Sequence, residues 1–474
     1  MHKQSLIQNR LPLLTQAALI GVYLALFTPA VYSGDNFMQA LTGGKPSLHL
    51  RYRFEGVDQE GFARKAEAST LRTHLGYLTG DFHGFGAFLQ FEDVRVIGSE
   101  RYNSTANGLT QYPVVADPEG NEINQAYLSF KGVPDTIFKY GRQTIIYDNQ
   151  RFIGNVGWRQ NEQTYDAFTA QNTSLKSTAI SYAHITNVNR IFGEDHPTQS
   201  DLGMKGDLIN VAYTGFKVGK IVGYGYFLDY DRGQTFPITA SNKTVGARFD
   251  GNYSLSSFKL LYTAEYANQN DYKNGASSVD ADYGYAMLGF EKKGVQLKLN
   301  YELLSGDGVY GFATPLATLH AFNGWADKFL NTPRDGIRDA FISVGGNAWG
   351  THLLAVYHDY SSDNLSYSYG SEWNFVASKK IRKYLTLSAK YATYNGDVNT
   401  LTSRAMGLQR CPKTLTNSGC RPNCNSKIRY KQRRFQWKNT CKSKTLRWCS
   451  TPKKANSSRS PTSISWCSRV SSSP

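Results

Sequence analysis

The chain has 474 residues, and its 53 Lys and Arg against 37 Asp and Glu give a formal charge of +16, which by itself suggests a nucleic-acid partner. The charge is uneven, because residues 401–474 hold 17 of the basic residues and no acidic one, which leaves residues 1–400 with 36 basic and 37 acidic residues. All six cysteines also lie in 401–474. The nearly neutral, cysteine-free remainder excludes a disulfide-stapled miniprotein, its low hydropathy excludes a bundle of membrane helices, and we expect no nucleic-acid partner.

Residues 1–33 have the layout of a secretory signal peptide. Basic residues up to Arg10 precede an apolar stretch from Leu11 to Phe27, and the small residues Ala30 and Ser33 follow. This order predicts cleavage after Ala30 or after Ser33. The alternative is a retained membrane anchor, which a polar residue within the apolar stretch disfavours.

Residues 34–400 are predicted to form strands in which apolar and polar side chains alternate. Near the start, Leu50 and Tyr52 alternate with Arg51 and Arg53, and the same period of two recurs along the chain. Many of these segments are long enough to cross a bilayer as tilted strands, and Tyr and Phe recur near their ends. We count 17 segments, beginning near Ser47, Ser69, Gly84, Glu122, Asp135, Thr164, Lys176, Gly206, Val218, Asn242, Leu255, Asp282, Val295, Ile337, Gly350, Gly370 and Lys383.

The connections between these segments alternate in length. Residues 97–121 and 146–163 form long connections, whereas Gly132 to Pro134 and Asn172-Thr173 form short ones. A soluble sheet has no reason for this asymmetry, but outer-membrane barrels have short periplasmic turns and long extracellular loops. The predicted fold class is therefore all-β: a transmembrane antiparallel β-barrel of the Gram-negative outer membrane. Such barrels have an even number of strands, so 18 are expected although 17 are readable.

Two stretches resemble the alginate export family of outer-membrane porins. They are YGRQTIIYDNQRFIGNVGWRQNEQTYDAF (Tyr140 to Phe168) and FATPLATLHAFNGWADKFLNTP (Phe312 to Pro333), and the resemblance extends over about Ser47 to Asp397. It implies an 18-stranded monomeric barrel, and the best-known member of the family exports the polyanion alginate through a pore lined by arginine and lysine. The resemblance also implies a substrate-contacting role for the charged residues within the first stretch, which are Arg142, Arg151, Arg159 and Asp166.

The polar face of the predicted strands carries slightly more basic than acidic side chains. A basic excess inside a narrow pore would concentrate anions, and the arginine fork suits carboxylates. The alternative for each residue is an ion pair that ties neighbouring strands together. The predicted lumen residues on strands are Arg51, Arg53, Arg72, Arg248, Lys259 and Lys298.

Three local features leave alternatives open. Arg142 shares parity with Tyr140, which faces lipid, so either a bulge near Gly141 turns it inward or it lies at the strand end. The loop 146–163 either folds into the pore or lies on the surface. A short helix is predicted around Asn323 to Leu330, where His320, Trp325 and Asp327 either form a binding patch or belong to a loop that packs as a plug against the barrel mouth, which is the more economical account.

The predicted function is a channel for passive diffusion or export of anionic or sugar-like solutes, alginate-like polyuronates included. The alternative is a surface enzyme borne on the barrel, but the sequence lacks a Gly-x-Ser-x-Gly or His-Glu-x-x-His motif. We expect no cofactor, no metal and no enzymatic activity. The expected partners are outer-membrane lipid and lipopolysaccharide, the barrel assembly machinery, and an anionic or carbohydrate solute.

Residues 401–474 form a basic, Cys- and Ser-rich tail in which strand alternation stops abruptly. One interpretation is a disordered arm that binds lipopolysaccharide or nucleic acid, and Cys420 and Cys424 form a weak candidate metal site. Another is a frameshift shortly after Asp397, because the tail stands where an eighteenth strand with a C-terminal aromatic residue is expected. In that case another reading frame should encode an amphipathic strand ending in Phe or Trp.

Overall fold

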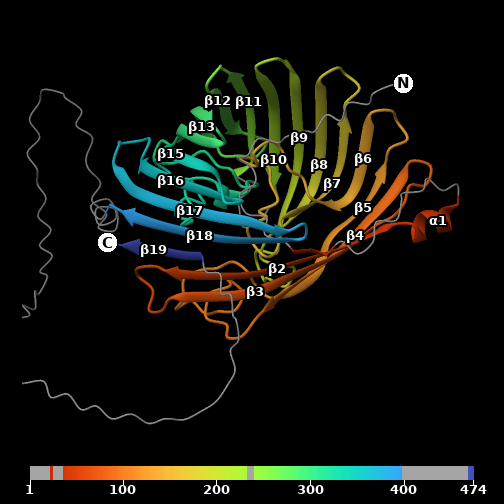
Figure 1. Ribbon diagram of the computed structural model, residues 1–474, viewed down its shortest axis with the longest axis horizontal. Coiled ribbons are helices and arrows are strands. Elements are labelled where there is room, and N and C mark those ends of the chain that lie inside the picture. Colours follow the sequence, from red (N-terminus) through yellow and green to blue (C-terminus); the bar gives the residue numbers. More distant parts are fainter. Residues whose placement is uncertain (1–21, 25–35, 232–239, 398–467, 474) are drawn as a thin grey trace, which may run out of the picture. The chain divides into compact units, whose positions relative to one another are not determined.

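A computed structural model describes residues 36–231 and 240–397 in full and the backbone of residues 22–24 and 468–473. Strands β2 to β18 form one antiparallel sheet in which each strand pairs with the next in the chain (Figure 1). Most of the predicted signal peptide 1–33 and most of the tail 401–474 lie outside the described residues. The strands are β2 (Lys45–Asp58), β3 (Ala66–Leu78), β4 (Phe85–Val96), β5 (Gly120–Phe130), β6 (Thr136–Gln143), β7 (Thr164–Asn172), β8 (Thr178–Asn189), β9 (Asp201–Phe216), β10 (Gly219–Tyr230), β11 (Asn242–Ser254), β12 (Lys259–Asp271), β13 (Asp280–Lys292), β14 (Val295–Leu304), β15 (Ile337–Ala348), β16 (Thr351–Ser361), β17 (Ser368–Arg382) and β18 (Leu385–Gly396).

The 17 antiparallel strands confirm the predicted strand count and the all-β fold class. Each strand begins within five residues of its predicted start. The largest difference is at β9, which begins at Asp201 because Leu202 and Met204 already alternate inward and are fully buried. Strand boundaries shift in this way because alternation can continue into a polar loop.

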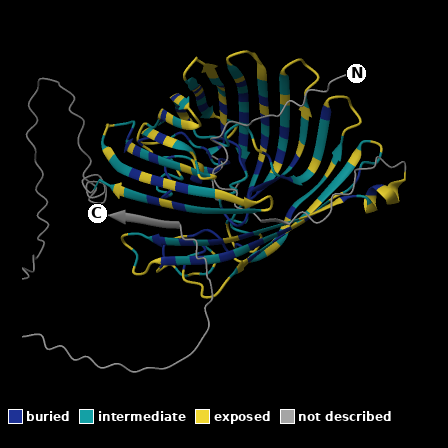
Figure 2. Cartoon of the chain, viewed as in Figure 1, coloured by how far each residue is buried: buried dark blue, intermediate teal, exposed yellow. Residues whose placement is uncertain are grey.

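The strands bury their charged side chains and expose their apolar ones. On β2, Arg51 is only 3% exposed while its neighbour Tyr52 is 47% exposed, and on β3 Arg72 is buried while Leu75 is 55% exposed. Figure 2 shows the resulting alternation of colours along the strands. This is the reverse of a soluble sheet, and it matches a barrel whose outer face meets lipid and whose inner face lines a lumen.

The connections alternate between long and short, as predicted. The long ones, which follow even-numbered strands, include 97–119, 144–163 and 305–336, whereas 217–218 and 293–294 are short. All the long connections leave the same end of the barrel, because successive strands are antiparallel. The loops that could enter the lumen therefore all start from one rim.

The barrel has a seam between its first and last antiparallel strands. Because 17 strands separate into eight hairpins and one extra strand, β2 and β18 run in the same direction. Strand β19 (Ser468–Ser473) pairs parallel with the end of β18 and with the end of β2, while β1 (Val22–Leu24) pairs antiparallel with the start of β2 at residues 48–50. Within the described strands, residues 385–390 of β18 have no ladder partner on the seam side.

The described chain contains one short α-helix, α1 (Phe37–Thr42), and the 3₁₀ turn η2 (Leu319–Ala321). No helix in this part of the chain has the length and apolar character needed to span a membrane. The helix predicted at Asn323 to Leu330 was wrong. Asn323, Gly324 and Asp327 all have positive φ values, and such residues interrupt a right-handed helix.

Candidate functional site: the plugged lumen

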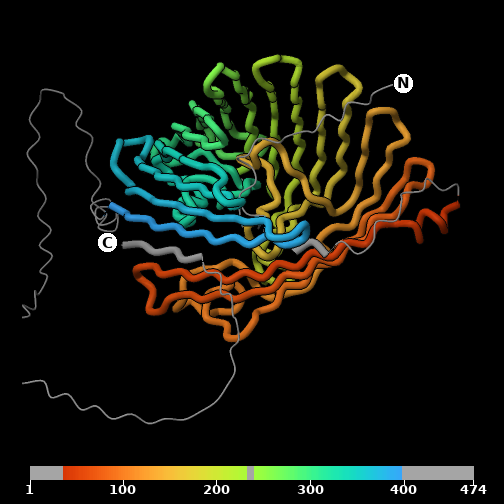
Figure 3. The backbone as a smooth tube through the Cα atoms, in the orientation of Figure 1, coloured from red at the N-terminus to blue at the C-terminus, as the bar shows by residue number. Residues whose placement is uncertain are grey.

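Two long connections, 144–163 and 305–336, enter the space enclosed by the strands, and together they are called the plug below. Ile153 in the first and Phe312 in the second are at most 1% exposed. Backbone bonds join the two segments, from Gly154 N to the Leu316 carbonyl and from Thr318 N to the Gln150 carbonyl. Figure 3 traces both segments, yellow-orange and teal, among the strands. Of the two alternatives for the first loop, the structure therefore shows the inward fold.

One side of the plug packs on an aromatic wall formed by β10 and β13. Phe152 contacts the rings of Tyr224 and Tyr283, with ring centroids 5.2 Å apart in both pairs. Phe312 packs on Tyr283 at 5.7 Å. These buried side chains belong to the largest apolar cluster of the described chain. Burial of several aromatic rings gives this side of the plug a firm attachment.

The opposite side of the plug meets the arginines of β2 and β3. Arg51 donates from Nε to Gln160 Oε1 at 2.9 Å and from Nη1 to the Gly157 carbonyl at 2.7 Å. Arg72 donates from Nη1 to the Glu162 carboxylate at 3.0 Å. Because the strands supply the cations and the loop supplies the acceptors, these contacts fix the loop rather than leave the arginines open to solutes.

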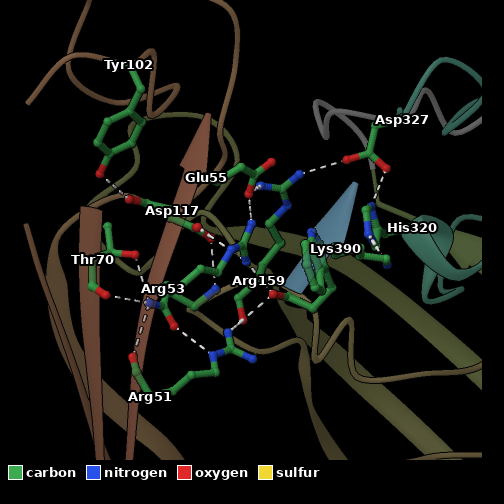
Figure 4. Close-up of polar contacts among 12 residues, drawn as sticks. Arg51, Arg53, Glu55, Thr70, Tyr102, Asp117, Arg159, His320, Asp327 and Lys390 are labelled. Carbon is green, nitrogen blue, oxygen red and sulfur yellow. Dashed lines mark hydrogen bonds and ion pairs between the residues drawn. The ribbon is translucent and has the colours of Figure 1, made fainter. Parts of the chain in front are cut away.

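Arg53 occupies a crowded position between three segments (Figure 4). Its guanidinium donates to the Trp158 carbonyl, forms an ion pair with Glu55, and lies 3.4 Å from the carboxylate of Asp117. Its Cζ also lies 4.4 Å from the centroid of the Trp158 ring. Asp117 in turn accepts a bond from the backbone N–H of Gln160 at 2.8 Å. The loop 97–119 thereby joins the network.

A chain of charged groups links β18 to both plug segments. Lys390 Nζ lies 2.7 Å from His320 Nε2, and His320 Nδ1 lies 2.6 Å from Asp327. Since an ammonium can only donate, Nε2 accepts and the ring proton sits on Nδ1, from which it is donated to Asp327. Arg159 Nη2 completes the chain with a bond of 2.8 Å to Asp327.

Stacked rings enclose this chain. The Trp158 ring lies parallel to His320 at 4.2 Å, and Lys390 Nζ lies 4.2 Å from the Trp158 centroid and 3.9 Å from that of Trp325. Each cation–π contact is worth about 1–2 kcal/mol when desolvated. The charges and rings together form a latch between β18 and the plug, which is defined below as Trp158, Arg159, His320, Asp327 and Lys390.

The electrostatics of the latch favour a neutral histidine and an ionised aspartate. Burial lowers the pKa of His320 to about 3, and the positive charges of Lys390 and Arg159 add to the effect against the opposing pull of Asp327. Burial raises the pKa of Asp327, but contact with His320 and the charge of Arg159 outweigh it and hold the pKa well below its usual range. Both shifts make the docked plug bind fewer protons than a released one.

Acidification should therefore loosen the latch. The plug is most stable above the ordinary His pKa of 6.5, and this stability is lost as the pH falls towards the docked value of about 3. We expect channel current to rise as the pH is lowered from about 7 to about 4 and the rise to be much smaller in His320→Gln. Measurement of open-channel current against pH in planar bilayers tests this. His184→Gln, at a half-exposed ion pair with Asp207 on β8 and β9, is the matched control and should keep the full pH response.

The remaining predicted lumen residues fall into two groups. Arg151 pairs with Glu302 at 2.8 Å, and Arg248 binds both Asp250 and Glu265 at 2.6 Å, so these arginines are buried and neutralised. The lysines differ: Lys298 is buried and Lys259 is partly exposed, and neither forms an ion pair within the described part of the chain.

Arg142 and Asp166 lie on the outer side of their strands. They pair directly across β6 and β7 at 3.0 Å, and their neighbours Gln143 and Tyr165 are the buried ones. Arg142 also pairs with Glu194 at 2.6 Å. The ladders on both sides of Gly141 run without a register shift, so no bulge turns Arg142 inward and the strand-end alternative holds.

Gly141 has a steric role of its own beside Arg142. Its φ is +124°, and a Cβ built there would lie 2.3 Å from the carbonyl oxygen of Ala126 on β5. Only glycine fits such a position. Within the stretch that resembles the family, Gly141 and Arg142 therefore serve close strand packing and an ion pair at the strand end.

Several members of the network were missed as site residues. Lys390 lies on a strand, and nothing in the local sequence shows that it would meet His320. Asp117 and Gln160 lie in loops without periodicity, and their partners are far away in sequence. The Trp158-Arg159-Gln160 element of the family resemblance was the available signal, because all three residues take part in the plug contacts.

Comparisons with known proteins agree with the fold of this chain. The solved structure of Acinetobacter baumannii OccAB2 has a TM-score of 0.60 at 14% identity, covering 76% of this chain and 93% of that one. Pseudomonas aeruginosa OccK9 (OpdG) has a TM-score of 0.58 at 13% identity, covering 74% and 94%. Pseudomonas aeruginosa OpdK with vanillate has a TM-score of 0.58 at 12% identity, covering 74% and 93%. At these identities the likeness shows the fold alone.

The family comparison reaches further. No curated protein matches the chain. The profile described as "Alginate export" matches residues 47–395, which span almost the whole sheet from β2 to β18. The chain therefore belongs to the alginate export family, with the fold of an outer-membrane β-barrel porin.

Proposed function

We propose that this protein is a passive channel of the Gram-negative outer membrane for anionic or sugar-like solutes. The observation that carries the proposal is the inverted burial of the strands, which puts Arg51, Arg72 and Arg248 inside and apolar rings outside. A barrel of this size leaves an aqueous lumen unless loops fill it, and here the plug narrows it. Passage therefore depends on the space and the groups that the plug leaves.

The charge of the lumen is compatible with the passage of both small anions and small neutral sugars. The arginines of β2 and β3 provide a basic wall, which would attract anions and suits carboxylates such as those of uronates. Their charges are balanced by Glu55 on β2, Asp117 in the connection 97–119 and Glu162 in the plug, so the net field is weak. A weak field lets neutral sugars pass as well as anions. The structure of OpdK with vanillate provides an example of a small anion with a protein of this fold.

Planar-bilayer recording tests the proposal. The full chain, refolded into lipid and shown to be folded by its heat-modifiable mobility on gels, should give stepwise currents with a weak anion preference in a salt gradient. Folded protein that inserts into the bilayer without current steps would contradict the channel function and favour the alternative of a surface enzyme. Strong cation preference would contradict the basic wall.

A further inference from the structure

A cavity of about 190 Å³ remains between the plug and the wall formed by β11 and β13 to β16. Its walls combine aromatic rings with amide side chains, and both kinds of group come from the strands and from the plug. An apolar cavity of about 150 Å³ is known to hold a benzene ring, so this volume suits one substituted six-membered ring and is far too small for a polymer. Among the described residues that line the cavity, none comes from β2 or β3, which carry the arginine wall.

Five aromatic side chains contribute to the lining. Tyr283 and Tyr285 come from β13, Phe341 from β15, and Phe322 and Trp325 from the plug. Aromatic side chains offer flat, apolar surfaces with a polar tip, and such surfaces pack well against the faces of a ring. Since they come from opposite sides of the cavity, a flat ligand can be held between them.

Several hydrogen-bonding groups of the lining are unused. Within the described part of the chain, no partner is recorded for the Asn149 and Gln150 amide nitrogens or for the Ser343 hydroxyl. His358 uses Nδ1 on Asp339 at 2.9 Å, which leaves Nε2 available to accept from a ligand when the ring is neutral or to donate when it is charged. Donors and acceptors of this kind match hydroxyl groups, which both donate and accept.

The charged groups of the lining are already balanced. Arg248 binds two carboxylates, Asp250 and Glu265, through Nε, Nη1 and Nη2. Glu302 pairs with Arg151 at 2.8 Å and accepts a bond from Asn323. A ligand carboxylate would meet a guanidinium that two protein carboxylates already neutralise, and it would gain little there.

We infer that this cavity is a binding site for a single uncharged, hydroxyl-bearing ring, that is, a neutral monosaccharide unit. The inference rests on the proposed channel function and names the solute class that the pore holds in transit. The aromatic faces stack on the ring, while the Asn149 and Gln150 amides and the Ser343 hydroxyl bind its hydroxyl groups. The site lies apart from the arginine wall, so neutral sugars and anions would use different sides of the lumen.

The test uses a pair of probes that differ by one charge. Glucose and glucuronate share a ring, but glucuronate carries a carboxylate. We expect glucose to reduce the ion current of open channels in a saturable way and glucuronate to do so with an affinity lower by about fivefold or more. Tighter blocking by glucuronate, or equal blocking by a long-chain polyuronate, would overturn the inference.

Two substitutions place the effect at the cavity. Phe341→Leu removes a stacking face and should weaken the block by glucose by about fivefold, and Ser343→Ala should weaken it by a smaller factor. Phe375→Leu, on the outer face of β17 where Phe375 is 43% exposed, is the matched control and should leave the block unchanged. Channels that conduct without any block by glucose would overturn the sugar site and leave the channel function intact, whereas absence of conductance would be a failure of the channel function itself.

Discussion

Replacement of residues 149–162 and 313–331 by short Gly-Ser linkers is expected to raise single-channel conductance by roughly fivefold, because barrels of 16 to 18 strands enclose an aqueous channel when no loop fills it. Both segments carry fully buried side chains, among them Ile153 and Leu316. They also carry His320, Trp158 and Trp325, which contact Lys390 of β18. Conductance in planar bilayers measures the effect.

The double substitution Glu162→Gln and Asp327→Asn should make the channel more selective for anions. It removes two carboxylates that now balance Arg72 and Arg159, while every basic residue of the lumen stays in place. A lumen with unbalanced guanidinium groups raises the local concentration of anions. The reversal potential in a salt gradient reports this shift.

The control for both effects is a variant with the rim connection 272–279 shortened instead. This connection joins β12 to β13 and contributes nothing to the plug contacts described above. It should conduct like the unaltered channel. If loss of the plug left conductance unchanged in folded barrels, the plug would not be the constriction.

Supplying an antiparallel strand between β2 and β18 should raise the unfolding temperature of the barrel by about 10 °C or more. We propose that residues 401–474 are the product of a frameshift that removed the eighteenth strand. The variant that tests the effect of this strand replaces residues 398–474 by a ten-residue amphipathic strand ending in Phe. In lipid, each unsatisfied backbone group costs several kcal/mol, and residues 385–390 of β18 have no ladder partner on the seam side among the described strands. Unfolding is followed by the loss of the fast-migrating folded band on gels as temperature rises.

The matched control keeps the added length without the alternation. A replacement strand with the same composition in scrambled order should give no gain, because its apolar side chains would face both lipid and lumen. Equal stability of the ordered, scrambled and unaltered chains would show that the seam is not a weak point. The proposal of a frameshift is tested separately by translation of the same DNA in the other two frames after Asp397.

Local periodicity was enough to predict the strands of this barrel. The alternation of Arg51 and Arg53 with Leu50 and Tyr52 is visible in any short window, and it decides which side chains share a face. The period of two also showed that Arg142 shares parity with Tyr140, which left a bulge or a strand-end position open for this predicted lumen residue, and the ladders of β6 show no register shift there. The helix expected at Asn323 to Leu330 failed because that segment follows contacts with β17 and β18 rather than its own propensity.

The sequence by itself determined the strand count, the direction in which each side chain points and the single rim that carries the long loops, since all of these follow from a local period and from the antiparallel reversal of the chain. Only the tertiary structure decided that carboxylates of the long connections neutralise the basic wall. Arg53 meets Asp117 and Arg72 meets Glu162 across long stretches of chain, and such pairs leave no periodic trace in the sequence. The cavity between Tyr283 and Trp325 has the same origin, because its shape depends on how two loops pack against a wall that is formed by other strands.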